Sequence, residues 1–307
     1  MKVLILGAGA IGSFIGAKLS SVSDVVLFSR NRAHIQKIQK EGLIIEELTG
    51  EKKRFHLKSI FDLKDLEHLP DLIIVLVKSY DTEEAVSSVL SIKKENTLFL
   101  TLQNGIGNVE KIAKFIDPNM ILAGTTAMGS ALIEPGYIKH GGSGPTYFGK
   151  ITGPPDELTK EIASMFNKAG LETYVVEDPN LYIWKKLIIN TGINAITAIA
   201  QIKNGWIYKN RYAKEIAQKA VEEAVSVANK MGIEFKEDMV ETMLNVAKAT
   251  SENISSMYQD ILKGKRTEID AINGAIVRFA KDLGVHTPIN QTLTNLVKII
   301  EEKVVGK

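Results

Sequence analysis

The sequence predicts an α/β domain built on a parallel sheet, followed by a domain made only of helices. β-like and helical segments alternate through the first half of the chain, and the strand pattern disappears from Tyr182 onward. Such alternation is typical of a doubly wound parallel sheet with helices on both faces. Asp178-Pro179 restricts the backbone just before the next helix begins. We therefore expect one domain at 1–178 and an all-helical domain at 179–307.

The chain opens on a dinucleotide-binding fingerprint of the Rossmann type. An apolar run, Val3 to Leu6, precedes Gly7-Ala8-Gly9-Ala10-Ile11-Gly12, and a helix-compatible stretch and a β-like run at 24–28 follow. In such a unit the first glycine permits a tight turn, the second lets the backbone approach a pyrophosphate, and the third lets the helix pack closely on the sheet. The free N–H groups of the helix then face the phosphates. We expect the cofactor to be bound by Gly7, Gly9, Ala10, Ile11 and Gly12.

The second β-like run is followed by basic residues rather than by an acidic one. A site for NAD usually has Asp or Glu here to bind the ribose hydroxyls, whereas this chain has Ser29, Arg30 and Arg32. The missing acid, together with Arg30, favours a cofactor with a 2′-phosphate, which is NADP. The alternative for Arg30 is an ordinary solvated loop charge.

Two further buried strands are expected at 71–77 and 97–102, with a helix at 82–90 between them. Ligands of open α/β sheets bind beyond the carboxyl ends of the strands, which makes Lys78 and Asn104 candidates for the cofactor site. A solvated strand end and a turn residue are the alternatives. Short strands at 121–132, 137–140 and 146–148 are expected to form a meander that extends the far edge of the sheet. A helix at 156–169 and a strand at 172–176 complete this domain.

Helices are expected at 182–200, 211–231, 236–262, 268–283 and 291–303. In the first of them, Lys186, Asn190 and Asn194 are spaced i, i+4, i+8 and share one face of a mostly apolar helix. A helix that is apolar nearly all round is buried, so this polar stripe is expected to face something enclosed. A stripe that faces solvent is the alternative.

Polar residues also interrupt the apolar stripe of the predicted helix at 236–262. Thr250 and Asn253 lie at core-like positions, and Ser256 follows one turn later. Polar side chains in a core need partners, and a bound ligand is one such partner. Glu268 opens the next predicted helix, where complementing the helix dipole is an alternative role.

Together these motifs resemble the ketopantoate reductase family over essentially the whole chain. The fingerprint, Arg30, Lys78 and Asn104 are similar to the family's cofactor side. Trp184-Lys185-Lys186-Leu187 with Asn190 and Asn194 resembles its catalytic helix. Residues 252–257 and Thr267-Glu268-Ile269-Asp270 resemble its substrate side. Ala195 departs from the pattern, since members often carry proline after that asparagine.

The resemblance implies reduction of 2-dehydropantoate to pantoate by NADPH, a step of pantothenate and coenzyme A biosynthesis. It implies that Lys186 is the general acid and that Glu268 holds a substrate hydroxyl, which makes both catalytic. Asn253 and Ser256 would bind substrate, and Asn104, Asn190 and Asn194 would complete that set. A lysine ammonium suits this reaction because it stabilises the charge that grows on a ketone oxygen and donates the proton. Burial should lower its pKa, whereas Glu268 and the substrate carboxylate should raise it.

Two other functions remain open. One is a related reductase of another 2-oxo or 3-hydroxy acid, because sites on one fold diverge in substrate. The other is a non-catalytic NADP-binding sensor, which would need neither Lys186 nor Glu268.

Composition excludes several classes. The formal net charge of +2 and the mixed signs of charge predict no nucleic-acid partner. No apolar run reaches the length of a membrane span, and glycines interrupt the apolar N-terminus, so we expect a cytoplasmic protein without a membrane partner. The absence of cysteine excludes disulfides and thiolate catalysis, and no metal site is expected. The expected partners are a 2-oxo acid substrate and a second copy of the chain in a homodimer.

Overall fold

The chain forms two compact units in this computed structural model, which describes residues 1–305. The first, called here the α/β unit, comprises Met1–Gln103 and Asn108–Tyr182. The second, the helical unit, comprises Asn104–Gly107 together with the chain from Ile183 onward. A doubly wound α/β sheet followed by helices was the predicted fold class, and it is confirmed.

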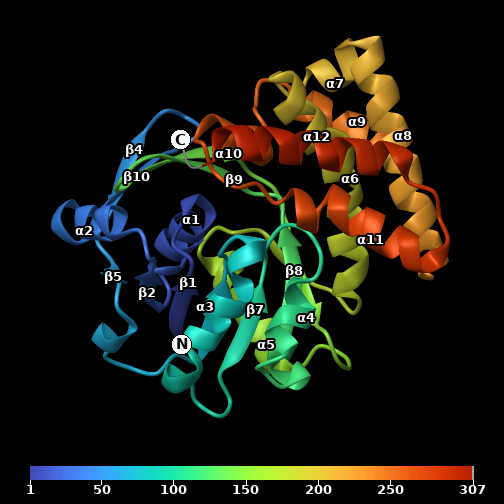
Figure 1. Ribbon diagram of the computed structural model, residues 1–307. Helices are drawn as coiled ribbons and strands as arrows, with labels where there is room; N and C mark the ends of the chain where they lie inside the picture. Colours follow the sequence, from blue (N-terminus) through green and yellow to red (C-terminus); the bar gives the residue numbers. More distant parts are fainter. Residues whose placement is uncertain (306–307) are drawn as a thin grey trace. The chain divides into compact units, whose positions relative to one another are not determined.

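An eight-stranded sheet lies at the centre of the α/β unit (Figure 1), with the order β12-β11-β8-β7-β6-β1-β2-β5. Its strands are β1 (Lys2–Leu6), β2 (Asp24–Phe28), β5 (Lys58–Ile60), β6 (Leu72–Val75), β7 (Leu98–Thr101), β8 (Ile121–Thr126), β11 (Thr146–Lys150) and β12 (Thr173–Val175). Six neighbouring strands run parallel, in the spatial order β5, β2, β1, β6, β7 and β8. Strand β11 pairs antiparallel with β8. The carboxyl ends of the parallel strands therefore share one edge, where a cofactor site is expected.

Helices cover both faces of this sheet because the residues of its strands are apolar on both sides. Val3 and Ile5 of β1 pack in a core with α1 (Ala10–Leu19), α2 (Arg32–Glu41) and α5 (Glu157–Lys168). Leu4 and Leu6 of the same strand pack on the opposite face with α3 (Thr82–Ser88) and α4 (Asn108–Ala113). Strands buried on both faces are typical of parallel sheets.

A second sheet was not predicted. It has the order β4-β3-β10-β9, with β3 (Leu43–Glu46), β4 (Lys52–Phe55), β9 (Gly129–Glu134) and β10 (Tyr137–Gly142). The expectation that 121–148 form one meander at the sheet's far edge was therefore wrong in part, since only β8 and β11 extend the main sheet.

Contacts with α1 and α2 explain why the β9–β10 hairpin leaves the main sheet. The amide of Gly136, in its turn, donates to Nδ1 of buried His34 at 2.9 Å. The His140 ring lies 4.4 Å from the ring of Phe14 on α1, measured between centroids. Burial lowers the pKa of His34 to about 4, so the ring stays neutral and accepts this hydrogen bond at neutral pH.

The helical unit packs small residues where its helices meet. It contains α6 (Pro179–Ala200) from Ile183 onward, and α7 (Trp206–Lys209), α8 (Arg211–Lys230), α9 (Met239–Ala249), α10 (Ser256–Leu262), α11 (Asn273–Leu283) and α12 (Pro288–Val304). The buried face of α8 carries Ala217, Ala220, Ala224 and Ala228. A Cβ on Gly192 of α6 would lie 2.9 Å from Val221 of α8, so glycine permits this close approach.

Two of the predicted helices are broken. The expected helix at 236–262 is two helices, α9 and α10, separated by residues 250–255. Backbone carbonyls of this segment accept hydrogen bonds from residues outside it instead of continuing a helix. Asn253 and Ser251 accept the amides of Asn204 and Gly205 through their carbonyls, and the side chain of Ser255 caps α10. The expected helix at 268–283 is a short 3-10 turn, Ile269–Ala271, followed by α11. There the carbonyl of Ala271 accepts the amide of Ile106 at 3.0 Å instead of continuing a helix.

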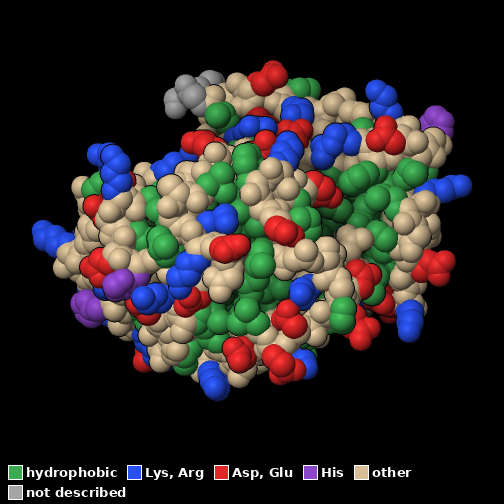
Figure 2. Space-filling model, turned by 90° about the horizontal axis from the view of Figure 1, so that it is seen from below, with side chains coloured by type: hydrophobic (Ala, Val, Ile, Leu, Met, Phe, Trp, Pro, Cys, Tyr) green, Lys and Arg blue, Asp and Glu red, His purple; other side chains and the backbone are tan. Residues whose placement is uncertain are grey.

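Within residues 1–305, no helix is both long enough and apolar enough to cross a membrane. Basic and acidic side chains are interspersed on the face drawn in Figure 2.

Candidate functional site

The fingerprint turn is shaped by two glycines that no other residue could replace without strain. Gly7 has φ +108°, and a Cβ there would lie 2.6 Å from the amide nitrogen of Val77. A Cβ on Gly12 would lie 2.2 Å from the carbonyl oxygen of Gly7. The amides of Gly7 and Ala8 donate to Phe28 O at 3.1 and 2.8 Å, which joins the turn to the end of β2.

Gly9 leaves open space at the N-terminus of α1. It is the N-cap of that helix, and no side chain caps the helix there. Apart from Gly9 and its two chain neighbours, no heavy atom of residues 1–305 lies within 4 Å of the position of a Cβ on Gly9. The first amides of a helix, here those of Ala10 and Ile11, have no partner within the helix. Space, free amides and a helix N-terminus fit the pyrophosphate of a dinucleotide.

Arg30 follows β2 as expected, but it is already paired with two carboxylates. Its guanidinium lies 3.0 Å from the carboxylate of Asp81 and 2.8 Å from that of Glu84. Asp81 belongs to the turn after β6 and Glu84 to α3. Their hydrogen bonds and charges raise the pKa of Arg30 above its ordinary value. The sequence around Arg30 does not indicate either acid, because both lie about fifty residues further along the chain.

Lys78 lies at the carboxyl end of β6, in a loop that is held from several directions. Gln103, at the end of β7, donates to Val77 O at 2.8 Å and to the hydroxyl of Thr82 at 2.9 Å. Lys111 donates to Ser79 O at 2.6 Å. The role of Gln103 in holding this loop was missed, although its amide directly after an apolar strand, next to that of Asn104, is a signal that could have indicated it.

Asn104 lies in the helical unit, beside the turn that carries Glu268. The next residue, Gly105, has φ +79°, and a Cβ there would lie 2.5 Å from Ala271 O. Ile106 donates its amide to the same oxygen. Asn104 was predicted on the cofactor side and Glu268 on the substrate side. Through Gly105, Ile106 and Ala271, the structure places their two segments next to each other within the helical unit.

Lys186 lies in the helical unit, where Glu268 acts on it electrostatically. Burial lowers the pKa of Lys186 to about 8, and the negative charge of Glu268 acts in the opposite direction. Glu268 itself is only 7% exposed. The neighbouring Lys185 pairs instead with Glu237, so the two lysines have different surroundings. A lysine whose pKa lies near neutral pH is suited to act as a general acid.

The other predicted substrate residues lie along α6, in the 250–255 break and at the first residue of α10. Asn194 is buried and Asn190 is partly buried, whereas Asn253 and Ser256 are exposed. The hydroxyl of Thr197 on α6 donates to Ser255 Oγ at 2.8 Å, which ties the break to the helix that carries Lys186. The sequence predicts the polar interruption at Thr250, Asn253 and Ser256, but it does not indicate that a break between two helices lies there.

A buried carboxylate on α12 fixes the backbone before Glu268. Glu301 accepts the amide of Thr267 at 2.6 Å, and the residues are 9% and 1% exposed. No local pattern in the sequence could have indicated this bond, because the two residues are 34 positions apart.

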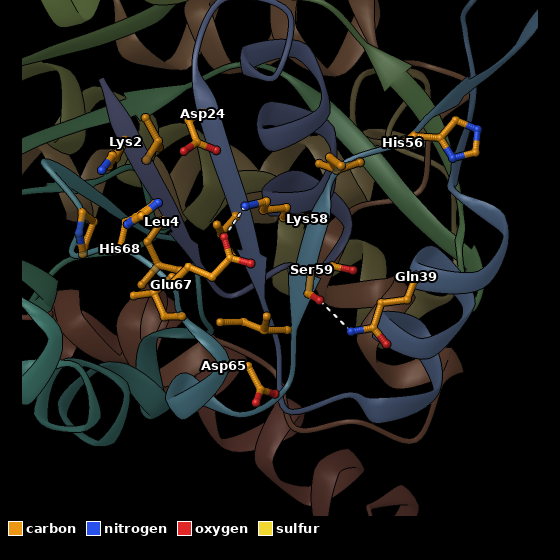
Figure 3. A pocket seen from close by; sticks show the side chains of 16 residues that line it. Lys2, Leu4, Asp24, Gln39, His56, Lys58, Ser59, Asp65, Glu67 and His68 are labelled. Carbon is orange, nitrogen blue, oxygen red and sulfur yellow. Dashed lines mark hydrogen bonds and ion pairs between the residues drawn. The ribbon is translucent and has the colours of Figure 1, made fainter.

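A cavity of about 520 Å³ lies elsewhere in the α/β unit (Figure 3). It is lined by Lys2, Asp24 and Lys58, the first residues of β1, β2 and β5, so it lies at the amino ends of the strands rather than at the ligand-binding edge. The Lys58–Glu67 ion pair, at 2.6 Å, lines it, and His56 and His68 lie on opposite sides. Across residues 1–305, no group of three or more His, Asp or Glu is arranged to hold a metal ion.

Comparisons with known proteins cover both units. The family model described as "Ketopantoate reductase PanE/ApbA" matches residues 3–153, and "Ketopantoate reductase PanE/ApbA C terminal" matches residues 178–301. A 2-dehydropantoate 2-reductase of Pyrococcus horikoshii is 43% identical over 98% of each chain.

Solved structures share the fold over nearly the full length. A ternary structure of D-mandelate dehydrogenase with NADH and anilino(oxo)acetate has a TM-score of 0.92 at 30% identity and covers 99% of both chains. A PanE/ApbA family ketopantoate reductase from Ralstonia eutropha JMP134 has a TM-score of 0.90 at 29% identity, again over 99% of both chains. On the match of both family models and the similarity to the Pyrococcus enzyme, this chain belongs to the ketopantoate reductase family and is an oxidoreductase acting on a CH–OH group.

Proposed function

We propose that this chain reduces 2-dehydropantoate to pantoate with NADPH, a step towards pantothenate and coenzyme A. The observation that carries the proposal is Lys186, a lysine with a pKa of about 8 that interacts with the buried carboxylate of Glu268. A sensor that only binds nucleotide would need no such pair. The 2-dehydropantoate 2-reductase of Pyrococcus horikoshii, at 43% identity, supports the choice of substrate.

Binding of the cofactor is assigned to the α/β unit. The amides of the fingerprint turn and of the first turn of α1 would hold the pyrophosphate, and Lys78 lies at the same carboxyl edge of the sheet. Arg30 would meet the 2′-phosphate, which is the basis for NADP over NAD. When bound, the reduced nicotinamide supplies the hydride.

Substrate binding and protonation are assigned to the helical unit. Hydride addition to the ketone carbon turns the carbonyl oxygen into an alkoxide-like group, and Lys186 donates its Nζ proton to that oxygen as the C–O double bond is lost. With a pKa of about 8, about nine in ten Lys186 side chains carry the proton at pH 7. Glu268 would accept a hydrogen bond from the substrate hydroxyl. The remaining substrate contacts are assigned to Asn104, Asn190, Asn194, Asn253 and Ser256.

A second candidate is reduction of a different 2-oxo acid. It is favoured by the similarity to D-mandelate dehydrogenase, whose solved complexes hold NADH. Fold and general acid would be the same, and the side chains around the substrate would differ.

One assay separates the candidates. Oxidation of NADPH by the purified protein is followed with 2-dehydropantoate and with a panel of 2-oxo acids that includes phenylglyoxylate. We expect the highest kcat/KM with 2-dehydropantoate. A higher value with an aryl 2-oxo acid would replace the proposed substrate, and no oxidation with any acid would contradict an enzymatic role.

We further propose that the protein is a cytoplasmic homodimer that associates through its helical unit. Trp206, Tyr212 and Ile216 of α7 and α8 are 51%, 60% and 40% exposed, and apolar side chains of this size favour association when they gather on one surface. Light scattering of the purified chain gives its mass directly. A monomer at micromolar concentration would remove this part of the proposal.

A further inference from the structure

The surroundings of Arg30 differ from those expected of a strong phosphate site. Both of its terminal nitrogens are engaged, one by Asp81 at 3.0 Å and the other by Glu84 at 2.8 Å. One positive and two negative charges give this cluster a net charge of −1. An arginine that reads a phosphate normally offers the same fork of N–H groups that is occupied here.

A 2′-phosphate that approaches the terminal nitrogens of Arg30 would compete with these carboxylates for the guanidinium. Glu84 is the easier to displace, because its side chain is 72% exposed and can swing into solvent. Asp81 is 29% exposed and belongs to the turn directly after Lys78, which Gln103 and Lys111 hold in place. Asp81 would therefore stay near the phosphate and repel it, since like charges at short range oppose binding.

Asp81 and Glu84 would not oppose the binding of NADH, which has a ribose hydroxyl in place of the 2′-phosphate. A carboxylate near the end of β2 accepts hydrogen bonds from ribose hydroxyls, which is the usual role of the acid in NAD sites. Here the acids would come from the turn after β6 and from α3 rather than from β2 itself.

We propose that Asp81 and Glu84 are specificity-determining residues that lower the preference of this enzyme for NADPH over NADH by competing with the 2′-phosphate for Arg30. The inference rests on the cofactor site of the proposed function. It makes the chain an NADPH-preferring enzyme that still accepts NADH, rather than a strictly NADPH-dependent one.

The test is the ratio of dissociation constants for NADH and NADPH, measured by titration of the nucleotide fluorescence in wild type, Asp81→Asn, Glu84→Gln and the double variant. Each change removes a charge and keeps the shape. We expect the NADH-to-NADPH ratio of Kd to rise about three- to tenfold in the double variant, mostly through tighter NADPH binding. The rise in this ratio should be smaller at high salt, because Arg30 and Glu84 are exposed and salt screens exposed charges.

Glu83→Gln is the matched control. Glu83 precedes Glu84 on the same helix but pairs with Lys114 at 2.7 Å, so the variant removes an equal charge without releasing Arg30. Its ratio should stay at the wild-type value. A ratio that rises equally in Glu83→Gln would reduce the effect to general surface charge and overturn the inference.

A ratio that is unchanged or lower in the double variant would also overturn it, since the acids would then hold Arg30 in the orientation that the phosphate needs. Failure of the proposed function gives a different result. In that case wild type binds neither nucleotide, or binds both and does not turn over 2-dehydropantoate, whereas the inference about Asp81 and Glu84 is decided by the ratio alone whenever binding occurs.

Discussion

The glycine turn of the α/β unit, proposed to bind nucleotide, and the proposed substrate site of the helical unit are built in opposite ways. The first consists of backbone: glycines within six residues and the N-terminus of α1 create its space and its donors. The second consists of side chains from α6, from the 250–256 segment and from the turn at Glu268. A backbone site is sensitive to any added Cβ, whereas a side-chain site is sensitive to the loss of single groups. Variants of each kind test whether this division is real.

The largest effect is expected from Lys186→Ala, which removes the proposed acid. The turnover number should fall by a factor of roughly 10² to 10⁴, because the substrate carbonyl oxygen loses its proton donor. The affinity for NADPH should barely change, because Lys186 is not among the proposed cofactor contacts. Steady-state kinetics and a nucleotide titration measure the two quantities.

Lys185→Ala is the control, since Lys185 pairs with Glu237 and not with Glu268. Turnover should stay near the wild-type value. If Lys185 were essential and Lys186 dispensable, the catalytic face of α6 would be assigned wrongly.

Glu268→Ala should reduce catalysis less than Lys186→Ala does, and mainly by weakening substrate binding. We expect kcat/KM for 2-dehydropantoate to fall about ten- to hundredfold, the usual worth of a charged hydrogen bond, with KM raised and kcat lowered. The pH profile adds a second readout, because Lys186 loses a neighbouring negative charge and its pKa should fall further. An unchanged KM would contradict the anchoring role of Glu268.

Gly9→Ala should separate binding from stability in the α/β unit. Its Cβ would meet nothing within 4 Å, so we expect Tm to shift by less than about 2 °C. The same Cβ would occupy the space proposed for the pyrophosphate and weaken NADPH binding by roughly tenfold or more. Gly12→Ala is the contrast, since its Cβ would lie 2.2 Å from Gly7 O and should lower Tm itself. Undisturbed NADPH binding in Gly9→Ala would place the pyrophosphate elsewhere.

Arg30→Ala gives the smallest of these effects. The KM for NADPH should rise by about tenfold at most, which is at or below the lower end of the usual effect of one charged hydrogen bond, because Asp81 and Glu84 already compete for this side chain. The KM for NADH should change much less. Equal shifts for both nucleotides would make Arg30 an ordinary surface charge.

Local sequence patterns were sufficient for the parts of the fold whose signals are local. The fingerprint glycines, strand β2 and the stripe of Lys186, Asn190 and Asn194 follow from turn chemistry and periodicity within one or two elements. Strand β4 escaped prediction because Lys52-Lys53-Arg54 has no apolar alternation, and its partner β3 pairs with distant β10. The break at 250–255 and the pairing of Arg30 depend on contacts with Asn204, Gly205, Asp81 and Glu84, which no short window of sequence contains.

The central claim is that a charged Lys186 donates the proton, and the pH dependence of kcat/KM tests it most directly. Lys186 has a pKa of about 8, so its ammonium form is present below that pH and disappears above it. For 2-dehydropantoate reduction by the wild-type protein we predict a kcat/KM that is level at neutral pH and falls about tenfold per pH unit above pH 8 to 9. The residual activity of Lys186→Ala should lack this descending limb. A wild-type profile that stays level to pH 10, or a limb that persists without Lys186, would contradict the account.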